Sequence, residues 1–142
     1  MIALASPMRW QRFARLGTGQ RRLLVEAALR LAWAAVLCRL LPFGRAIRSG
    51  AIPLGQPCPF DIHATAGAIR QAAALVPFRA VCLQQGLACQ AMLRARGVDA
   101  RLHYGAATGE RLQAHVWVSV GECIVIGDEE AARFLPIACF PD

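Results

Sequence analysis

Apolar residues recur every three or four positions through the first two thirds of the chain, which is the spacing of amphipathic helices. Proline and glycine interrupt these segments, and Ser, Thr or Asp precedes them at helix-capping positions. The pattern predicts four helices, over residues 7–16, 19–41, 62–76 and 80–96. Residues 43–59 are rich in Gly and Pro and are predicted to form a loop.

From residue 98 onward the apolar period changes to two, which is the period of a half-buried strand. Strands are predicted over 98–104, 115–120 and 123–128, with a polar loop over 105–113 and an apolar tail over 134–140 that packs back on the body. Helices followed by an antiparallel sheet make an α+β fold. A chain of 142 residues is long enough for one domain with its own core.

The last two predicted strands form a hairpin that sets the register of its side chains. Gly121-Glu122 is expected to be the turn, because glycine is favoured at the first position of a type II′ turn. Continuing the register from this turn places Asp128 directly opposite His115 on one face, with Cβ atoms roughly 4.5–5.5 Å apart. A strand bulge would bring one of the two following glutamates into that place instead.

The charge of the chain is strongly basic, with a formal net charge of +7 and 16 basic residues, all of them arginine. This charge favours acidic partners. A nucleic-acid partner is not predicted, because the chain has no zinc-finger spacing, no aromatic-basic stacking motif and no contiguous basic arm. Five arginines near the N-terminus form a candidate docking surface, at positions 9, 12, 15, 21 and 22.

The apolar fraction is high, at 56%, but no uncharged run approaches the roughly 20 residues that cross a membrane. The most apolar segment, 23–41, is interrupted by Glu26, Arg30 and Arg39. We interpret it as a core helix, with peripheral contact to a membrane surface as the less favoured alternative. No secretory signal is present, so a cytoplasmic protein with free thiols is expected.

Six cysteines lie at irregular spacing, at positions 38, 58, 82, 89, 123 and 139. The chain has no Cys-x-x-Cys and no Cys/His pair at metal-ligand spacing, so no metal site is predicted. Cys82 falls in the first turn of its predicted helix, where the helix dipole and free N–H groups favour a thiolate. Cys89 lies mid-helix on the same face and is interpreted as a core residue.

Cys82, His115 and Asp128 together supply the three groups of a cysteine nucleophile site. The thiol attacks, the imidazole moves the proton, and the carboxylate holds the imidazole in one tautomer. The other two histidines, His63 and His103, are predicted to lie on the surface. The candidate site requires neither a metal nor another cofactor.

Several segments carry a family resemblance. They are CLQQGLA at 82–88, MLRARGVDARL at 92–102 and AHVWV at 114–118, together with RRLLVEA at 21–27 and LLPF at 40–43. They resemble the stand-alone leader peptidases of lasso peptide biosynthesis, which are maturation proteases of the transglutaminase-like superfamily. The resemblance covers nearly the whole chain and implies a transglutaminase/papain-like cysteine protease core over 59–142, preceded by a helical region and linker over 1–58.

The resemblance implies that Cys82 is the nucleophile, His115 the base and Asp128 the orienting acid. It implies removal of a leader from a ribosomally made precursor peptide, after which a separate ATP-dependent cyclase joins the freed amine to an acidic side chain. The first 42 residues are predicted to be two helices and not the strand-rich leader-recognition domain that some family members carry. A separate leader-binding protein is therefore the expected partner, with the cyclase as a second.

Two other functions fit the same residues. In a transglutaminase-like acyltransferase an amine, rather than water, would resolve the thioester, and the three site residues would be the same. In a non-catalytic scaffold that binds a peptide and the cyclase, Cys82 would be a structural residue.

Overall fold

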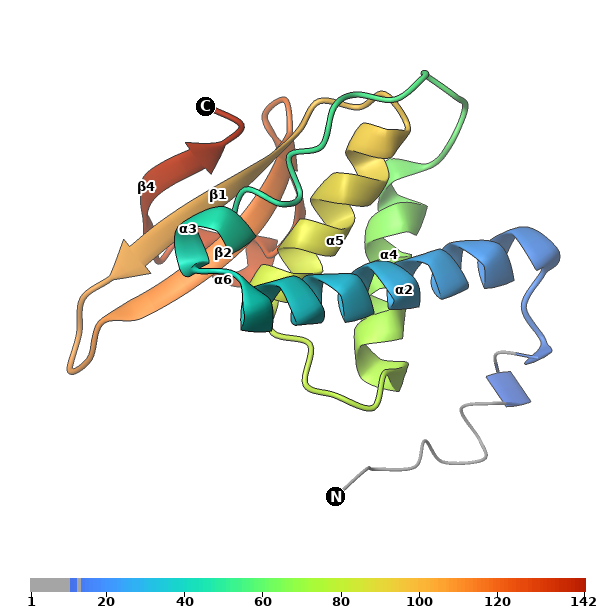
Figure 1. Cartoon of the computed structure of the whole chain (residues 1–142), viewed down its shortest axis with the longest axis horizontal. Helices are drawn as coiled ribbons and strands as arrows, with labels where there is room; N and C mark the ends of the chain where they lie inside the picture. The colour runs from blue at the N-terminus through green and yellow to red at the C-terminus, as the bar shows by residue number, and fades with distance from the viewer. Residues whose placement is uncertain (1–10, 13) are drawn as a thin grey trace.

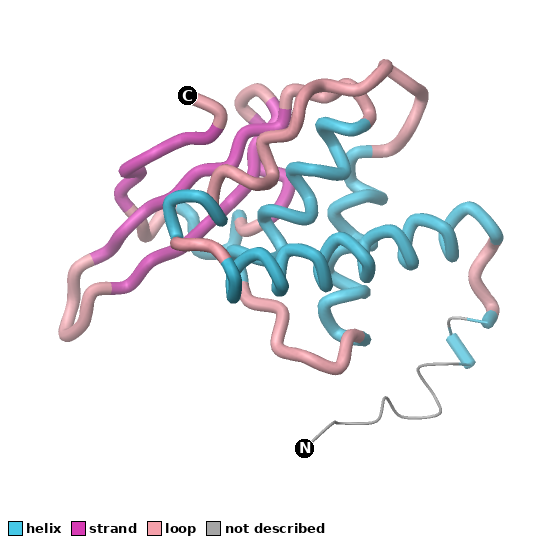
Figure 2. Tube along the Cα trace, in the orientation of Figure 1, coloured by secondary structure: helices cyan, strands magenta, loops and turns pink. Residues whose placement is uncertain are grey.

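The computed structural model describes residues 11, 12 and 14–142, so half of the predicted first helix at 7–16 lies outside the described residues, at 7–10 and 13. A layer of helices covers one face of a four-stranded antiparallel sheet (Figures 1 and 2). The main helices are α2 (Thr18–Leu40), α4 (Ile62–Leu75) and α5 (Cys82–Ala95), and a short α3 (Phe43–Ala46) follows α2. The predicted α+β class is confirmed.

Local sequence signals account for most of the helix ends. Asp61 caps α4, because its carboxylate accepts hydrogen bonds from the backbone N–H groups of His63 at 2.8 Å and Ala64 at 3.2 Å. The same helix stops at Leu75, just before Pro77, as predicted. Gly17, and not Thr18, is the N-cap of α2, a difference of one residue.

The core surrounds α5, which packs against α2 and α4 on one side and against the sheet on the other. α2 contributes its predicted inner face to this core, through Leu24, Ala27, Leu31 and Ala34. Arg96, just after α5, donates two hydrogen bonds to the Glu26 carboxylate on α2, at 3.0 and 2.6 Å. The N-terminal helical region therefore shares one core with the rest of the described chain.

The sheet has the strand order β3-β2-β1-β4, so the first strand lies in its interior. The strands are β1 (Ala100–Ala107), β2 (Gln113–Val120), β3 (Cys123–Ile126) and β4 (Leu135–Phe140). The first begins two residues later than predicted, at Ala100. The apolar tail does pack back on the body, and it does so as the edge strand β4, antiparallel to β1.

The hairpin of β2 and β3 follows the predicted register only near its turn. Val120 lies opposite Cys123 as expected, but a bulge then places Val118 opposite Ile126. The chain leaves the sheet at Gly127, which has a φ of +83°, and Asp128 opens a short helix, α6 (Asp128–Ala131). The prediction that Asp128 stands opposite His115 in a strand is therefore wrong, because the bulge and the turn end β3 before that position.

Gly86 allows α5 to lie unusually close to β2. A Cβ atom at this position would meet Val116 Cγ1 on β2 at 2.8 Å and Leu102 Cδ1 on β1 at 3.2 Å. A separation below 3 Å forces one of the two groups to shift. Cys82 lies one helical turn before Gly86, so this close packing also sets how far the thiol stands from the start of β2.

Gly86→Ala and Gly67→Ala form a matched pair that tests this packing. Each change replaces a helical glycine and should gain up to about 1 kcal/mol of helix propensity. A Cβ at Gly67 in α4 meets nothing within 4 Å, so Gly67→Ala should stabilise the protein. Gly86→Ala should instead lower the free energy of unfolding, because overpacking costs about 1–3 kcal/mol. Urea unfolding measures both, and equal stabilisation would contradict the close packing of α5 on β2.

Candidate active site

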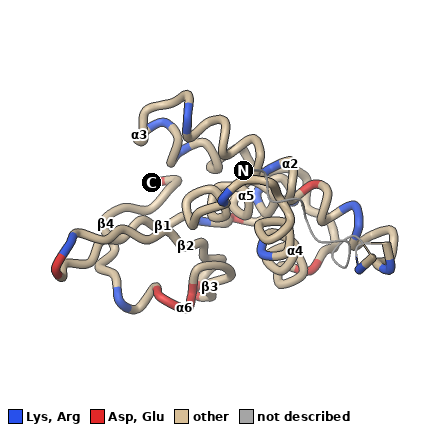
Figure 3. Tube along the Cα trace, turned by 90° about the horizontal axis from the view of Figure 1, so that it is seen from below, with Lys and Arg blue, Asp and Glu red and all other residues tan. Residues whose placement is uncertain are grey.

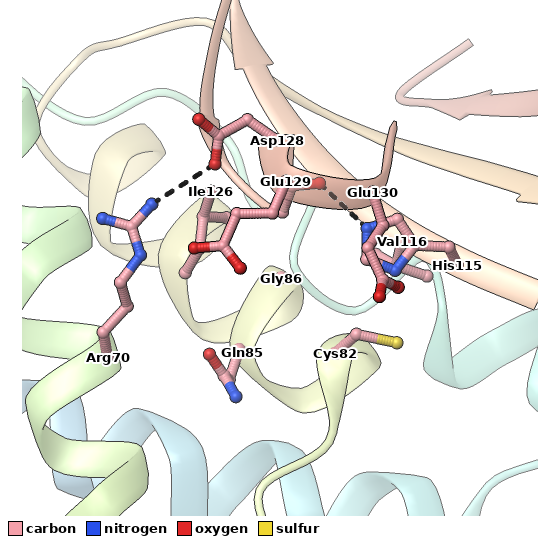
Figure 4. A pocket seen from close by; sticks show the side chains of 11 residues that line it. Arg70, Cys82, Gln85, Gly86, His115, Val116, Ile126, Asp128, Glu129 and Glu130 are labelled. Atoms are coloured by element: carbon pink, nitrogen blue, oxygen red, sulfur yellow. Dashed lines mark hydrogen bonds and ion pairs between the residues drawn. The ribbon is translucent and has the colours of Figure 1, made fainter. Parts of the chain in front are cut away.

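A surface cavity of about 320 Å³ opens where the N-terminus of α5, the start of β2 and α6 meet. Figure 4 shows Cys82 and Gln85 on the helix below this cavity, His115 on one side and Arg70 on the other. All three predicted site residues, Cys82, His115 and Asp128, thus line one pocket although 46 positions separate the first from the last. The complete lining is Arg70, Cys82, Gln85, Gly86, His115, Val116, Ile126 and residues 127–130.

Cys82 is the first residue of α5, as the sequence predicted, and it is exposed. The segment before it is tied to the helix by side-chain hydrogen bonds. Gln84 Oε1 accepts from the Val81 N–H at 3.3 Å, and Gln85 Nε2 donates to the Ala80 carbonyl at 2.9 Å. The free backbone N–H groups of the first helical turn lie at this position.

The His115 imidazole is half-buried and held on several sides. Its ring lies 6.0 Å from the ring of Trp117 and 5.0 Å from that of Phe134, measured between centroids. His115 Nε2 lies 2.9 Å from the Gly127 carbonyl oxygen. A carbonyl can only accept, so Nε2 carries the proton in this hydrogen bond and Nδ1 is the nitrogen with a free lone pair.

Among the described residues no hydrogen bond joins the Cys82 thiol to His115, so the two groups face one another across the pocket without direct contact. In Figure 4 the sulfur lies on the side of the helix that is nearer to the imidazole. Catalytic hydrogen bonds are commonly long in a protein without substrate and shorten when the substrate binds.

Asp128 lies in the same pocket, but its carboxylate points toward α4. It forms an ion pair with Arg70, at 3.8 Å between Oδ1 and Nη2. Both side chains are at least half exposed, so solvent screens this pair. In the described part of the chain no hydrogen bond connects Asp128 with His115, and the Gly127 carbonyl occupies the position next to the imidazole.

The bulge in the hairpin does not bring a glutamate opposite His115 either, because β3 has already ended at Ile126. Glu129 and Glu130 lie on α6 and line the pocket. Glu130 pairs with Arg133 at 3.9 Å, on the surface. The pocket lining therefore holds three carboxylates and one guanidinium, and its wall along α6 is acidic.

Gly127 and Arg70 are site residues that the sequence reasoning did not find. A Cβ at position 127 would meet the Val116 carbonyl oxygen at 2.8 Å and Trp117 Cβ at 2.9 Å, and the positive φ also favours glycine. A glycine directly before the acidic run 128–130 was the available signal for a tight turn. Arg70 reaches the site from α4 and also donates to the Val125 carbonyl at 3.2 Å, and no local sequence pattern marks it.

Cys89, His63 and His103 lie outside the pocket and differ in how far they are buried. Cys89 is fully buried, as predicted, and burial raises its pKa to about 12, so it stays a thiol. His63 is exposed in the first turn of α4, also as predicted. His103 is half-buried instead of lying on the surface: its ring stacks on Trp117 at 5.5 Å and its Nε2 lies 2.7 Å from Ser119 Oγ. Burial lowers the pKa of His103.

Within the described residues, no group of three or more His, Cys, Asp or Glu side chains is arranged to hold a metal ion. None of the helices in that part of the chain is both long enough and apolar enough to span a membrane.

A comparison with protein families shows to which superfamily the chain belongs. The family model of the transglutaminase-like superfamily matches residues 22–139, which is more than half of the sequence. The chain belongs to the transglutaminase-like superfamily. Cysteine protease and acyltransferase activities are common in this superfamily. The match begins inside α2, well before residue 59, where the sequence alone placed the start of the core. No curated protein and no solved structure shows a significant match.

Brief alkylation with iodoacetamide should modify Cys82 faster than any other cysteine, because Cys82 is exposed at a helix N-terminus and an imidazole that can take up its proton lines the same pocket. Cys58 and Cys123 are also exposed and serve as internal controls for accessibility alone. Cys89 should stay unmodified until the protein unfolds. Peptide mapping by mass spectrometry measures each rate, and equal rates at the three exposed cysteines would identify Cys82 as an ordinary thiol.

Proposed function

We propose that this protein is a cysteine protease that removes the leader from a ribosomally made lasso peptide precursor. The observation that carries the proposal is the placement of Cys82 at a helix N-terminus on one wall of a pocket and of His115 on another. Superfamily membership supports thiol chemistry of this kind. The resemblance of segments 82–88, 92–102 and 114–118 to lasso leader peptidases supports this choice of substrate.

In the first step Cys82 Sγ attacks the carbonyl carbon of the leader–core peptide bond while its proton passes to His115 Nδ1. Backbone N–H groups in the first turn of α5, at Cys82 and Leu83, stabilise the oxyanion that forms. The carbon–nitrogen bond then breaks, and the imidazolium gives its proton to the leaving amine of the core. A thioester between the leader and Cys82 remains.

In the second step water attacks the thioester carbonyl while His115 takes a proton from it. The carbon–sulfur bond breaks, the leader leaves as a free acid, and the Cys82 thiol is restored. The Gly127 carbonyl holds His115 in the tautomer that both steps need. Asp128 is the acid of the site in this proposal: its negative charge lies in the same pocket as the imidazole, without a direct hydrogen bond in this structure.

An acyltransferase that uses the same three residues is the main alternative, and superfamily membership supports it equally. The two activities differ in the group that resolves the thioester. A time course of precursor processing, analysed by mass spectrometry with and without an added primary amine, separates them. Free leader acid in both samples supports the protease, whereas a leader amide that forms in proportion to the amine supports the acyltransferase.

Cys82→Ala should abolish leader removal, and His115→Ala should lower its rate by about 10²–10⁴-fold, the usual contribution of a general base. Asp128→Asn should leave some activity, because Asp128 acts through charge while Gly127 orients the ring. Cys89→Ala should lower the unfolding temperature more than the rate, because Cys89 is a core residue.

Rates of leader release and circular dichroism melting curves on all four variants measure these effects. An inactive Cys89→Ala beside an active Cys82→Ala would overturn the assignment of the nucleophile. Full processing by folded Cys82→Ala would support the non-catalytic scaffold.

Processing of the precursor by this protein alone should be slow, and a separate leader-binding protein should raise the rate by increasing the local concentration of substrate. If the N-terminal arginines form the docking surface, replacing Arg12, Arg15, Arg21 and Arg22 by Gln should weaken partner-dependent cleavage. Arg9, the fifth member of that group, lies outside the described residues. Added salt should weaken it as well. Initial rates at low micromolar precursor measure the effect, and equal rates with and without the leader-binding protein would indicate a self-sufficient protease.

A further inference from the structure

The outer face of α2 is apolar although it is exposed to solvent. Its large side chains have exposed fractions between 42% and 75%, and they recur at spacings of four, four, three and four residues: Val25, Leu29, Trp33, Val36 and Leu40. We call these five residues the outer stripe. The opposite face of the same helix is in the core. A helix that is apolar on both faces is normally buried on both, whereas the outer stripe is left exposed in the described part of the chain.

The charges around the outer stripe are mostly positive. α2 carries four arginines and a single acid, Glu26. Two hydrogen bonds from Arg96 neutralise that acid. Arg22 continues the stripe at its N-terminal end, and Arg39 lies beside its C-terminal end. Figure 3 shows basic positions toward both ends of the helix. Carboxylates are therefore the complementary groups for the rim of this surface.

The shape of the surface favours a polypeptide over a lipid bilayer. Trp33 borders a small hollow of about 60 Å³ between α2 and α5. Val36 and Arg39 border a larger one, of about 380 Å³, which Phe78 and Arg79 close on the other side. Hollows on both sides of an apolar ridge can receive separate side chains of a partner, as at well-packed protein interfaces.

We propose that the outer stripe of α2 binds an amphipathic segment of another protein, with an apolar ridge bordered by Asp or Glu side chains. A second copy of this chain does not fit, because stripe-to-stripe pairing brings arginines together. In a parallel pair Arg22 faces Arg22, and in an antiparallel pair Arg22 of one copy faces Arg39 of the other. Like charges at both ends of a contact oppose association.

The docked segment would also reach the chain that precedes the nucleophile. Gln84, which bonds to the backbone of Val81, lines the larger hollow together with Phe78 and Arg79. A partner seated there contacts both the outer stripe and the segment that leads into Cys82. This binding surface is separate from the pocket that holds Cys82 and His115, and the inference does not depend on the reaction that occurs there.

A pair of synthetic peptides tests the proposal on the full chain. One is an amphipathic helix of about five turns, with leucines on one face and Glu on both borders; the other has Lys in place of each Glu. The Glu-bordered peptide should bind at least about tenfold more tightly, a difference of about 1.4 kcal/mol. Fluorescence anisotropy of the labelled peptides measures both affinities, and added salt should reduce the difference.

Variants of the chain locate the binding. Leu29→Glu combined with Trp33→Glu should weaken binding of the Glu-bordered peptide at least about tenfold. Both residues are exposed and glutamate is a good helix former, so the variant should keep its fold, which circular dichroism checks. Leu112→Glu and Ile137→Glu make the same chemical change at exposed apolar residues elsewhere and should bind normally.

Three outcomes would overturn the proposal. The first is equal or absent binding of the two peptides, or binding that the Leu29→Glu, Trp33→Glu variant retains. The second is a dimer in sedimentation experiments that this variant abolishes, which would assign the stripe to self-association. The third is stripe-dependent binding to vesicles of anionic lipid without binding of the Glu-bordered peptide, which would assign it to a membrane surface. None of these measurements requires cleavage of a precursor.

Discussion

The close packing of α5 against β2 is the contact on which the site depends. Gly86 removes the side chain that would hold the helix away from Val116, and Cys82 lies one turn earlier on the same helix. The first turn of α5 supplies the thiol and the free N–H groups, while β2 supplies His115 as its third residue. A small displacement between these two elements would therefore move the Cys82 thiol away from the His115 imidazole without changing the fold.

The second constraint is the turn at Gly127, where the chain passes close to β2 and directs its carbonyl to His115 Nε2. This hydrogen bond places the proton on one ring nitrogen and leaves the other with a free lone pair. Of the acids that follow, Asp128 points toward Arg70, while Glu130 lines the pocket and pairs with Arg133. A backbone carbonyl thus contacts the imidazole where the sequence analysis expected the Asp128 carboxylate.

The two faces of helix α2 have different surroundings. Its inner face, with Leu31 at the centre, contributes to the core on which α5 rests. Its outer face carries the uncovered stripe around Trp33 and borders a hollow that reaches the segment before Cys82. The superfamily match also begins within this helix, at residue 22, so it includes most of α2.

Local patterns in the sequence predicted the α+β class, the ends of three helices to within about two residues, and the position of Cys82 at the start of a helix. They were sufficient because helix capping, proline and the apolar period act over a few neighbouring residues. They also predicted the hairpin turn and its first pairs. The position of Asp128 and the edge strand β4 were decided only by tertiary structure. A single bulge changes every later cross-strand pair in the hairpin. The ion pair of Asp128 with Arg70 joins residues that are 58 positions apart, so the place of Asp128 depends on neighbours that no local pattern contains.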